Sequence, residues 1–170
     1  KFIEGNFGFA WRPFDSGKWA LLGKYTYLYD VSALPQVGDN VANFDQRSQV
    51  LSFEGVYKPN THWEFAGKLM RREGEVRFGR LAGQWADSGA TFAAGQARYA
   101  FADKWHALAE YRWLGVEDGG DRQGALIGID RDLGKNLRLG AGYNFTDFSD
   151  DLTDFDYDHK GWFVNLVGWY

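Results

Sequence analysis

Residues 19–30 read WALLGKYTYLYD, and in this stretch the character of the side chains alternates with a period of two. In an extended chain, Lys24 and Asp30 share one face. The opposite face carries only apolar and aromatic residues and a glycine, namely Trp19, Leu21, Gly23, Tyr25, Tyr27 and Tyr29. A helix would scatter these residues around its circumference, whereas a period of two is typical of a β-strand with two different faces.

The same alternation recurs along the chain. It predicts eight further strands, over residues 1–11, 49–58, 62–72, 91–101, 105–116, 124–131, 136–146 and 161–170. In several of them the charges keep one parity, as Glu64 does with Lys68 and Glu110 does with Arg112. No helix, linker or low-complexity segment interrupts the pattern, so we expect an all-β fold in a single domain over residues 1–170.

Alternation alone fits two architectures. A soluble sandwich or barrel places the apolar face inside, and a transmembrane barrel places it outside. Large aromatic residues stand near the ends of many predicted strands: Trp11, Trp19, Tyr29, Tyr57, Trp63, Trp105, Trp113, Tyr143, Trp162 and Tyr170. Aromatic girdles at both margins are typical of proteins in a bilayer. We therefore predict a transmembrane antiparallel up-and-down β-barrel with about 8–10 strands.

Composition excludes several other classes. The 170 residues contain no cysteine, which excludes a disulfide framework, a thiolate metal site and a cysteine nucleophile. The net charge of −4 argues against nucleic acid as a partner. No apolar run is long enough for a membrane helix, and the mean hydropathy of −0.45 does not exclude a barrel, whose apolar residues alternate with polar ones.

The connections alternate between short and long. The short ones are residues 12–18, 58–61, 102–104 and 132–135, and the long ones are residues 31–48, 73–90, 117–123 and 147–160. Outer-membrane barrels have short periplasmic turns and long external loops. We therefore assign the short connections to the periplasmic side.

Four stretches carry a family resemblance. The last ten residues, GWFVNLVGWY, resemble the C-terminal assembly signal of bacterial outer-membrane barrels, although Gly168 stands where a large apolar residue is usual. LLGKYTYLYD, LAEYRWL and LGAGYNFTDFSDDLTDFDYD resemble the C-terminal barrel region of large proteobacterial outer-membrane surface proteins. The resemblance extends from about residue 20 onward. It implies a barrel in the outer membrane, contact with its lipids and lipopolysaccharide, and delivery by the barrel-assembly machinery, and it implies no catalytic residue.

The predicted strand number is odd, whereas bacterial single-chain barrels have an even number. We expect that at least one preceding strand is missing and that the chain is the C-terminal part of a larger barrel. A miscounted strand in a barrel of eight or ten strands is the alternative.

The face opposite the apolar one gathers six acids and six bases. They are Glu4, Asp30, Glu54, Glu64, Glu110, Asp130, Lys24, Lys68, Arg72, Arg98, Arg112 and Arg138. We expect these residues to face the lumen, either as an ion-pair network in a packed interior or as the lining of a water-filled passage. Glu110 and Arg112 point the same way from one strand, so we expect their partners on neighbouring strands, with Arg98 and Arg138 as candidates.

The segment 147–158 carries Asp147, Asp150, Asp151, Asp154, Asp156 and Asp158. Ca²⁺ prefers six to eight oxygen ligands, so the segment is a candidate for a weak calcium site, with Asp151 and Asp154 as central ligands. A solvated acidic loop is the simpler interpretation, since the EF-hand spacing is absent.

Three functions remain. The first is a non-enzymatic barrel that forms the membrane-embedded part of a larger surface protein, without a cofactor other than weakly bound calcium. The second is a solute-conducting, porin-like pore. The third is a lipid-modifying enzyme, for which Ser149 and His159 with an aspartate are the candidates, although Ser149 lacks the rigid turn that exposes a serine nucleophile.

Overall fold

The computed structural model describes residues 2–14, 17–30, 44–78, 83–117, 119–146 and 160–168. These residues form ten strands: β1 (Phe2–Trp11), β2 (Trp19–Asp30), β3 (Phe44–Tyr57), β4 (Trp63–Phe78), β5 (Trp85–Asp87), β6 (Ala90–Ala102), β7 (Trp105–Val116), β8 (Gly120–Asp132), β9 (Leu137–Asn144) and β10 (Gly161–Gly168). Within the described ranges there is no helix of the length and apolar character that a membrane span requires.

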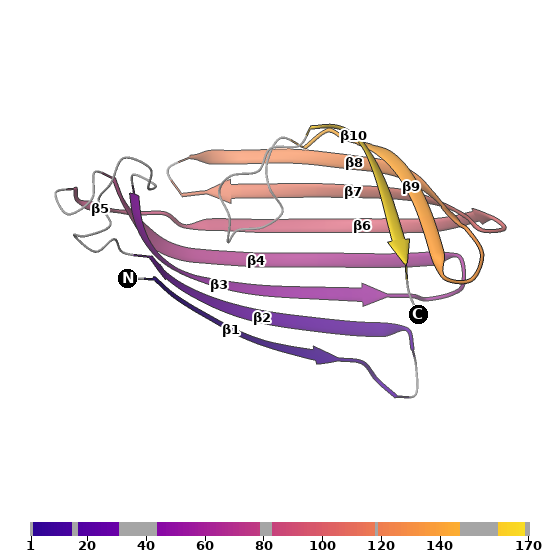
Figure 1. Ribbon diagram of the computed structural model, residues 1–170, viewed down its shortest axis with the longest axis horizontal. Coiled ribbons are helices and arrows are strands. Elements are labelled where there is room, and N and C mark those ends of the chain that lie inside the picture. The colour runs from indigo at the N-terminus through magenta and orange to yellow at the C-terminus, as the bar shows by residue number, and fades with distance from the viewer. Residues whose placement is uncertain are drawn as a thin grey trace.

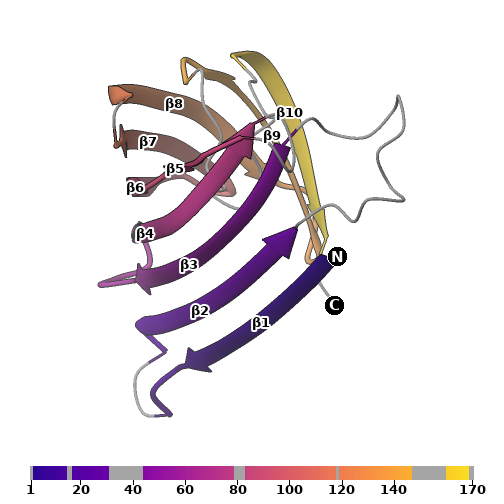
Figure 2. The same ribbon diagram turned by 90° about the vertical axis from the view of Figure 1, so that its left-hand side faces the viewer.

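The nine long strands form one antiparallel sheet in which each strand pairs with its neighbours along the chain. The order is β1-β2-β3-β4-β6-β7-β8-β9-β10, and the short β5 pairs with β4. The predicted all-β, up-and-down architecture is therefore confirmed. The sheet curves into a trough (Figure 2) and is open between its edge strands β1 and β10, which pair only with β2 and β9. Closure into a barrel stays a prediction.

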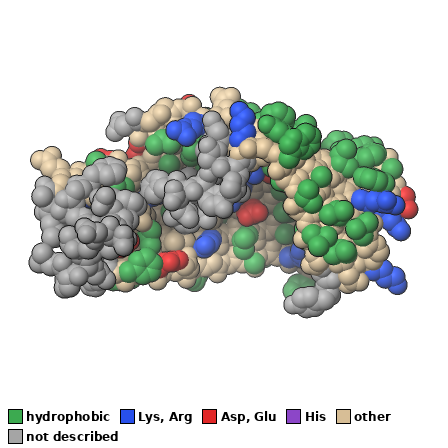
Figure 3. All heavy atoms as spheres, turned by 45° about the horizontal axis from the view of Figure 1, so that its top comes forward, with side chains coloured by type: hydrophobic (Ala, Val, Ile, Leu, Met, Phe, Trp, Pro, Cys, Tyr) green, Lys and Arg blue, Asp and Glu red, His purple; other side chains and the backbone are tan. Residues whose placement is uncertain are grey.

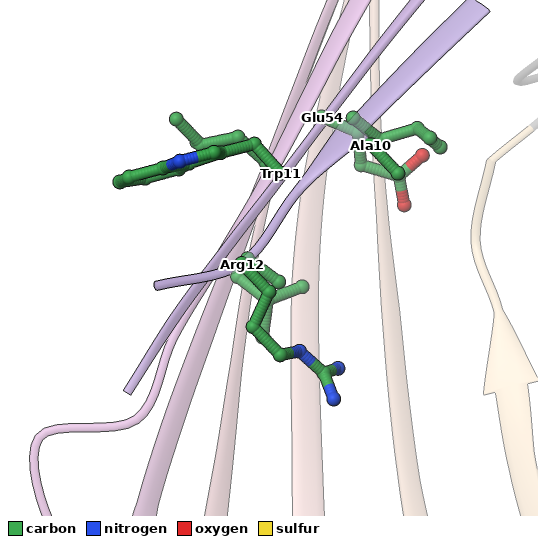
Figure 4. A pocket seen from close by; sticks show the side chains of 8 residues that line it. Ala10, Trp11, Arg12 and Glu54 are labelled. Carbon is green, nitrogen blue, oxygen red and sulfur yellow. The ribbon is translucent and has the colours of Figure 1, made fainter. Parts of the chain in front are cut away.

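The pairing register aligns one parity across the whole sheet. Lys24 lies opposite Ser52, Ser52 opposite Met70, Met70 opposite Phe92, and Phe92 opposite Leu114. One continuous face therefore consists of the even-numbered residues of β1–β4 and β6–β9 and the odd-numbered residues of β10. This face lines the trough, and we call it the inward face. The other parity forms the outward face. Figure 4 shows the two faces at one point, where the side chains of Trp11 and Glu54 point to opposite sides of the sheet.

The strands run between two ends of the sheet (Figure 1). The strand ends that the turns β1–β2, β3–β4, β6–β7 and β8–β9 join lie at one end, which we call the turn end, and the opposite strand ends form the loop end. Near the loop end, the inward face of β3, β4, β6 and β7 carries a small buried apolar cluster of Val50, Met70, Ala90, Phe92 and Leu114.

Several strands are longer at the loop end than the alternation predicted. β3 begins at Phe44, β4 continues to Phe78, and β8 begins at Gly120, so the long connection predicted over residues 117–123 is wrong. In β3 the added residues Asp45–Ser48 are polar on both faces, and in β4 the charged Glu73, Glu75 and Arg77 lie on the outward face, so the pattern of apolar outward and charged inward residues is lost. Their backbones still pair because charges match across the strands, as Arg47 and Glu75 do with Nε and Oε2 at 2.5 Å.

Candidate functional site

The outward face is apolar and the inward face is charged, which is the reverse of a soluble sheet. β8 shows this most clearly: Ile127 and Ile129 on the outward face are about half exposed, at 52% and 51%, whereas Asp130 on the inward face is 5% exposed. The same contrast holds on β4, where Leu69 is 53% exposed and Arg72 is 2% exposed. Burial of apolar side chains stabilises a sheet in water, so this arrangement leaves the outward face without its usual source of stability.

Aromatic rings line the turn end of the outward apolar face. Trp19 stacks on Tyr57 with ring centroids 4.1 Å apart, and Trp63 lies 4.6 Å from Tyr99. Such pairs add about 0.5–1.5 kcal/mol beyond their buried area. Their indole and phenol groups combine an apolar body with a polar tip, which suits a boundary between an apolar and an aqueous phase.

On the outward face, the side chains between the apolar region and the loop end of the sheet are charged. Arg71 pairs with Glu117 at 2.8 Å, and Arg77 pairs with Asp45 at 2.5 Å. The outward face thus has a sharp change of polarity, from Leu69 to Arg71 on a single strand.

The inward face carries an ion-pair network at the turn end, centred on Asp130. Its carboxylate lies 3.3 Å from Nη2 of Arg98, 3.4 Å from Nε of Arg138 and 3.0 Å from Nδ1 of His106. Asp132 lies 2.6 Å from Nε of Arg138. These residues come from four consecutive strands, β6 to β9, so the network ties the sheet together across its width.

The network continues toward β4. Arg98 Nη1 lies 3.7 Å from Glu64, and Glu64 lies 2.6 Å from Nζ of Lys58. With a neutral His106, the seven residues carry three positive and three negative charges. Apart from the exposed Lys58, their side chains are 7–25% exposed, so this balance determines whether the network stabilises the sheet or costs free energy.

A second inward cluster lies nearer the middle of the sheet. Nε of Arg112 donates a hydrogen bond to Glu110 on the same strand, and Nε2 of Gln96 donates to the other carboxylate oxygen at 2.8 Å. The prediction that Glu110 and Arg112 find their partners in Arg98 and Arg138 is therefore wrong. Side chains two residues apart on one strand face share a side, and the long Arg112 side chain reaches back to its neighbour.

The structure places all the predicted inward residues on the inward face, but joins only some of them. Glu64, Arg98, Asp130 and Arg138 belong to the turn-end network, and Glu110 and Arg112 to the second cluster. The remaining contacts are separate: Lys68 Nζ lies 5.9 Å from the Phe92 ring centroid, Glu4 accepts a hydrogen bond from Asn6 at 2.8 Å, and Arg72 Nη2 lies 3.4 Å from Gln46. Lys24 and Glu54 form no ion pair with any described residue.

Sequence reasoning missed three members of the turn-end network: Lys58, His106 and Asp132. All three have even numbers, and parity alone would have placed His106 on the inward face. Lys58 stands where the predicted strand 49–58 meets the connection 58–61, and Asp132 opens the connection 132–135, so only the exact strand ends could have revealed them.

Two hollows open on the trough. One of about 220 Å³ is lined by Glu54, Lys68, Gln96 and Glu110 around Phe92. Another of about 360 Å³ lies at the turn end beside β1 and is lined by residues that include Ala10, Arg12 and Glu54 (Figure 4). The first hollow is predominantly polar, so it can hold water or a small polar solute.

The acidic segment predicted to bind calcium lies outside the described residues, as do Ser149 and His159. Within the described part of the chain, no group of three histidine or acidic side chains is arranged to hold a metal ion.

No protein-family model, curated protein or solved structure matches this chain. The functional argument therefore depends on the sheet and its two faces.

Proposed function

We propose that this chain forms the membrane-embedded part of a larger surface protein, as a transmembrane β-barrel in a bacterial outer membrane, and that it has no enzymatic activity. The observation that carries the proposal is the inverted polarity of the sheet, with exposed apolar side chains outward and buried charges inward. A water-facing sheet of this kind would aggregate, whereas lipid chains would cover the same outward face favourably.

The dimensions of the apolar face support this proposal. On β2 every outward residue from Trp19 to Tyr29 is apolar, aromatic or glycine, a span of ten residue steps. Ten steps correspond to about 33 Å along a strand at about 3.3 Å per residue. With a strand tilt of about 40°, the height is about 25 Å, which matches the apolar band of outer-membrane barrels.

The open edges support a barrel that includes further strands. Lipid offers no hydrogen bonds, so every backbone group of a membrane sheet must be paired within the protein. β1 and β10 each have one unpaired edge. Nine long strands also make an odd number, so we propose that the complete barrel is larger and that at least one more strand pairs with β1.

Different surfaces of the sheet contact different partners in this proposal. Membrane lipids contact the outward apolar face, and lipopolysaccharide contacts it near the loop end. The barrel-assembly machinery engages the C-terminal strand, for which the unpaired edge of β10 is available. Nucleic acid is not proposed as a partner.

A solute-conducting pore is the alternative, favoured by one observation. The hollow lined by Glu54, Lys68, Gln96 and Glu110 lies on the inward face and is predominantly polar. Planar-bilayer recordings of the full-length protein separate the two functions. A steady open-channel current, with an ion selectivity that changes on Glu54→Gln, would favour the pore.

Site-directed spin labels test the membrane assignment. The protein is refolded into phospholipid vesicles with single labels at position 127 or position 110. We expect the label at 127 to collide with oxygen dissolved in lipid, and the label at 110 to be shielded from lipid. A label at 127 that is accessible to water-soluble nickel complexes instead would overturn the proposal.

A further inference from the structure

We propose that the outward face of β7–β10 holds a glycerophospholipid whose phosphate binds Arg131 at the turn end. This inference rests on the proposed function, because it takes the outward face to be in contact with lipid. It adds a specific headgroup contact, which the proposed function does not require.

The first observation is an apolar hollow of about 790 Å³ on the outward face. Its walls come from exposed side chains that include Ile127, Ile129, Leu139 and Trp162. Its floor includes the backbone at Gly128, Gly140 and Gly142 and the small Ala141. A hollow with such walls accepts acyl chains, and by itself it would accept those of any lipid.

The second observation is a charge at the turn-end margin of this hollow. Arg131 lies on the outward face of β8, two residues after Ile129 and one residue before the strand ends at Asp132. Its guanidinium carbon lies 5.2 Å from the centroid of the Trp105 ring, a cation–π contact that keeps it at this margin. It is exposed, and no carboxylate of the described residues pairs with it.

This arginine differs from the outward arginines near the loop end. Arg47, Arg71 and Arg77 are each neutralised by a glutamate or an aspartate. Arg131 keeps its charge at the edge of the apolar face, where a lone charge costs free energy unless an anion meets it. A guanidinium also presents parallel N–H groups that match the oxygens of a phosphate.

Two lysines add to the positive charge at this margin. The backbone carbonyl of Lys104 accepts a hydrogen bond of 2.9 Å from the amide of Asp132, so the β6–β7 turn lies beside the end of β8. Lys135 lies in the next turn, between β8 and β9. Neither lysine has an ion-pair partner among the described residues, and the nearby Asp132 is already occupied by Arg138.

Together these features select a lipid that combines two acyl chains with a phosphate near the membrane surface. Under the proposed orientation, the turn end faces the periplasm. The ligand is therefore a glycerophospholipid of the periplasmic leaflet. A free phosphate has no acyl chains to fill the hollow, and a diacylglycerol has no phosphate to bind Arg131.

The test measures lipid binding by native mass spectrometry of the full chain, folded in a non-ionic detergent. The probe is dioleoylphosphatidylglycerol, compared with dioleoylglycerol, which lacks the phosphate, and with glycerol 3-phosphate, which lacks the chains. Arg131→Gln removes the charge, and Arg131→Lys retains it. Arg122→Gln is the matched control, since Arg122 lies on the same strand but on the inward face near the loop end.

We expect Arg131→Gln to lower the affinity for dioleoylphosphatidylglycerol about tenfold, equivalent to about 1.4 kcal/mol. Arg131→Lys should retain most of the affinity, and Arg122→Gln should leave it unchanged. Equal binding by wild type and Arg131→Gln would overturn the inference. If Arg131→Gln does not fold, the wild type alone tests the inference. Wild-type affinity for dioleoylglycerol equal to that for dioleoylphosphatidylglycerol, or tight binding of glycerol 3-phosphate, would also overturn the inference.

Insertion into vesicles is measured in parallel, by the mobility of unheated protein in a denaturing gel. Wild type that inserts but does not prefer the phosphatidyl lipid refutes the lipid site and leaves the proposed function intact. Wild type that does not insert refutes the proposed function.

Discussion

Replacing Asp130 by asparagine tests whether the turn-end network stabilises the sheet. The substitution preserves the shape of the side chain and removes its negative charge. Three basic groups then lose their shared partner: Arg98, His106 and Arg138, which lie 3.3, 3.0 and 3.4 Å from the carboxylate. The change leaves a net positive charge in a mostly buried cluster.

The expected loss of stability follows from the exposure of these groups. The Asp130 side chain is 7% exposed, and its three basic partners are 16–22% exposed. Breaking a fully buried ion pair costs about 3–5 kcal/mol, and breaking an exposed pair costs about 0.2–1 kcal/mol. The cluster lies between these limits, and Glu64 and Asp132 still compensate part of the charge. We therefore expect the free energy of unfolding to fall by about 2–3 kcal/mol.

Urea-induced unfolding in phospholipid vesicles, followed by tryptophan fluorescence, measures this loss. For a slope of about 2 kcal/mol/M, the midpoint should fall by about 1–1.5 M. Glu54→Gln is the matched control, because Glu54 lies exposed on the same inward face and has no ion-pair partner among the described residues. Its effect should remain within about 0.5 kcal/mol. Equal midpoints for the two variants would show that the network contributes nothing to stability.

Further predictions concern the outward apolar face, the packing of the strands and the acidic segment. Ile127→Arg should lower the free energy of unfolding by about 2–4 kcal/mol, because it puts a charge in the middle of the apolar face. Leu139→Arg should lower it by only about 0–1 kcal/mol, since Leu139 lies opposite Arg131 near the margin. Equal losses in vesicle unfolding would refute this register. Gly142→Ala should destabilise by about 1–3 kcal/mol, because its Cβ would lie 2.3 Å from a backbone carbonyl of β8, and Gly95→Ala, which has open space, should change little; the comparison uses the same unfolding assay. Calcium at millimolar concentration should bind residues 147–158 with a Kd of about 10⁻⁴–10⁻³ M, and calorimetry without heat, together with an unchanged melting temperature, would reduce the segment to a solvated acidic loop.

The fold was predictable because one signal recurs in every long strand. Alternation such as that of Lys24 between Gly23 and Tyr25 assigns each residue to a face without knowledge of any partner strand. The extensions of β3 and β4 were not predictable by this signal. On β3, Arg47 and Gln46 are both polar although they lie on opposite faces, and on β4 the charged Glu75 lies outward whereas Val76 lies inward. Their pairing depends on charges that match across strands, which only the register reveals.

The candidate site was predictable in its face but not in its contacts. Parity placed Glu64, Arg98 and Asp130 on one side of the sheet. It could not say which of them meet, because neighbours across strands depend on the stagger between strands. Glu110 shows a different limit. Its partner Arg112 lies on the same strand, and the reach of the long arginine side chain, which parity does not describe, makes this contact.

Because the sheet is a meander, its width across the strands can change while the length of the strands stays the same. Each long strand pairs only with its neighbours along the chain, so a hairpin such as β8–β9 can be inserted or deleted as a unit. Two added strands widen the sheet by about 10 Å, at about 4.8 Å per strand, and leave every other turn at its own end. A single added strand would instead reverse all the strands that follow and move their short turns to the opposite end of the sheet. Hairpins are therefore the natural unit for engineering a wider or narrower version of this protein.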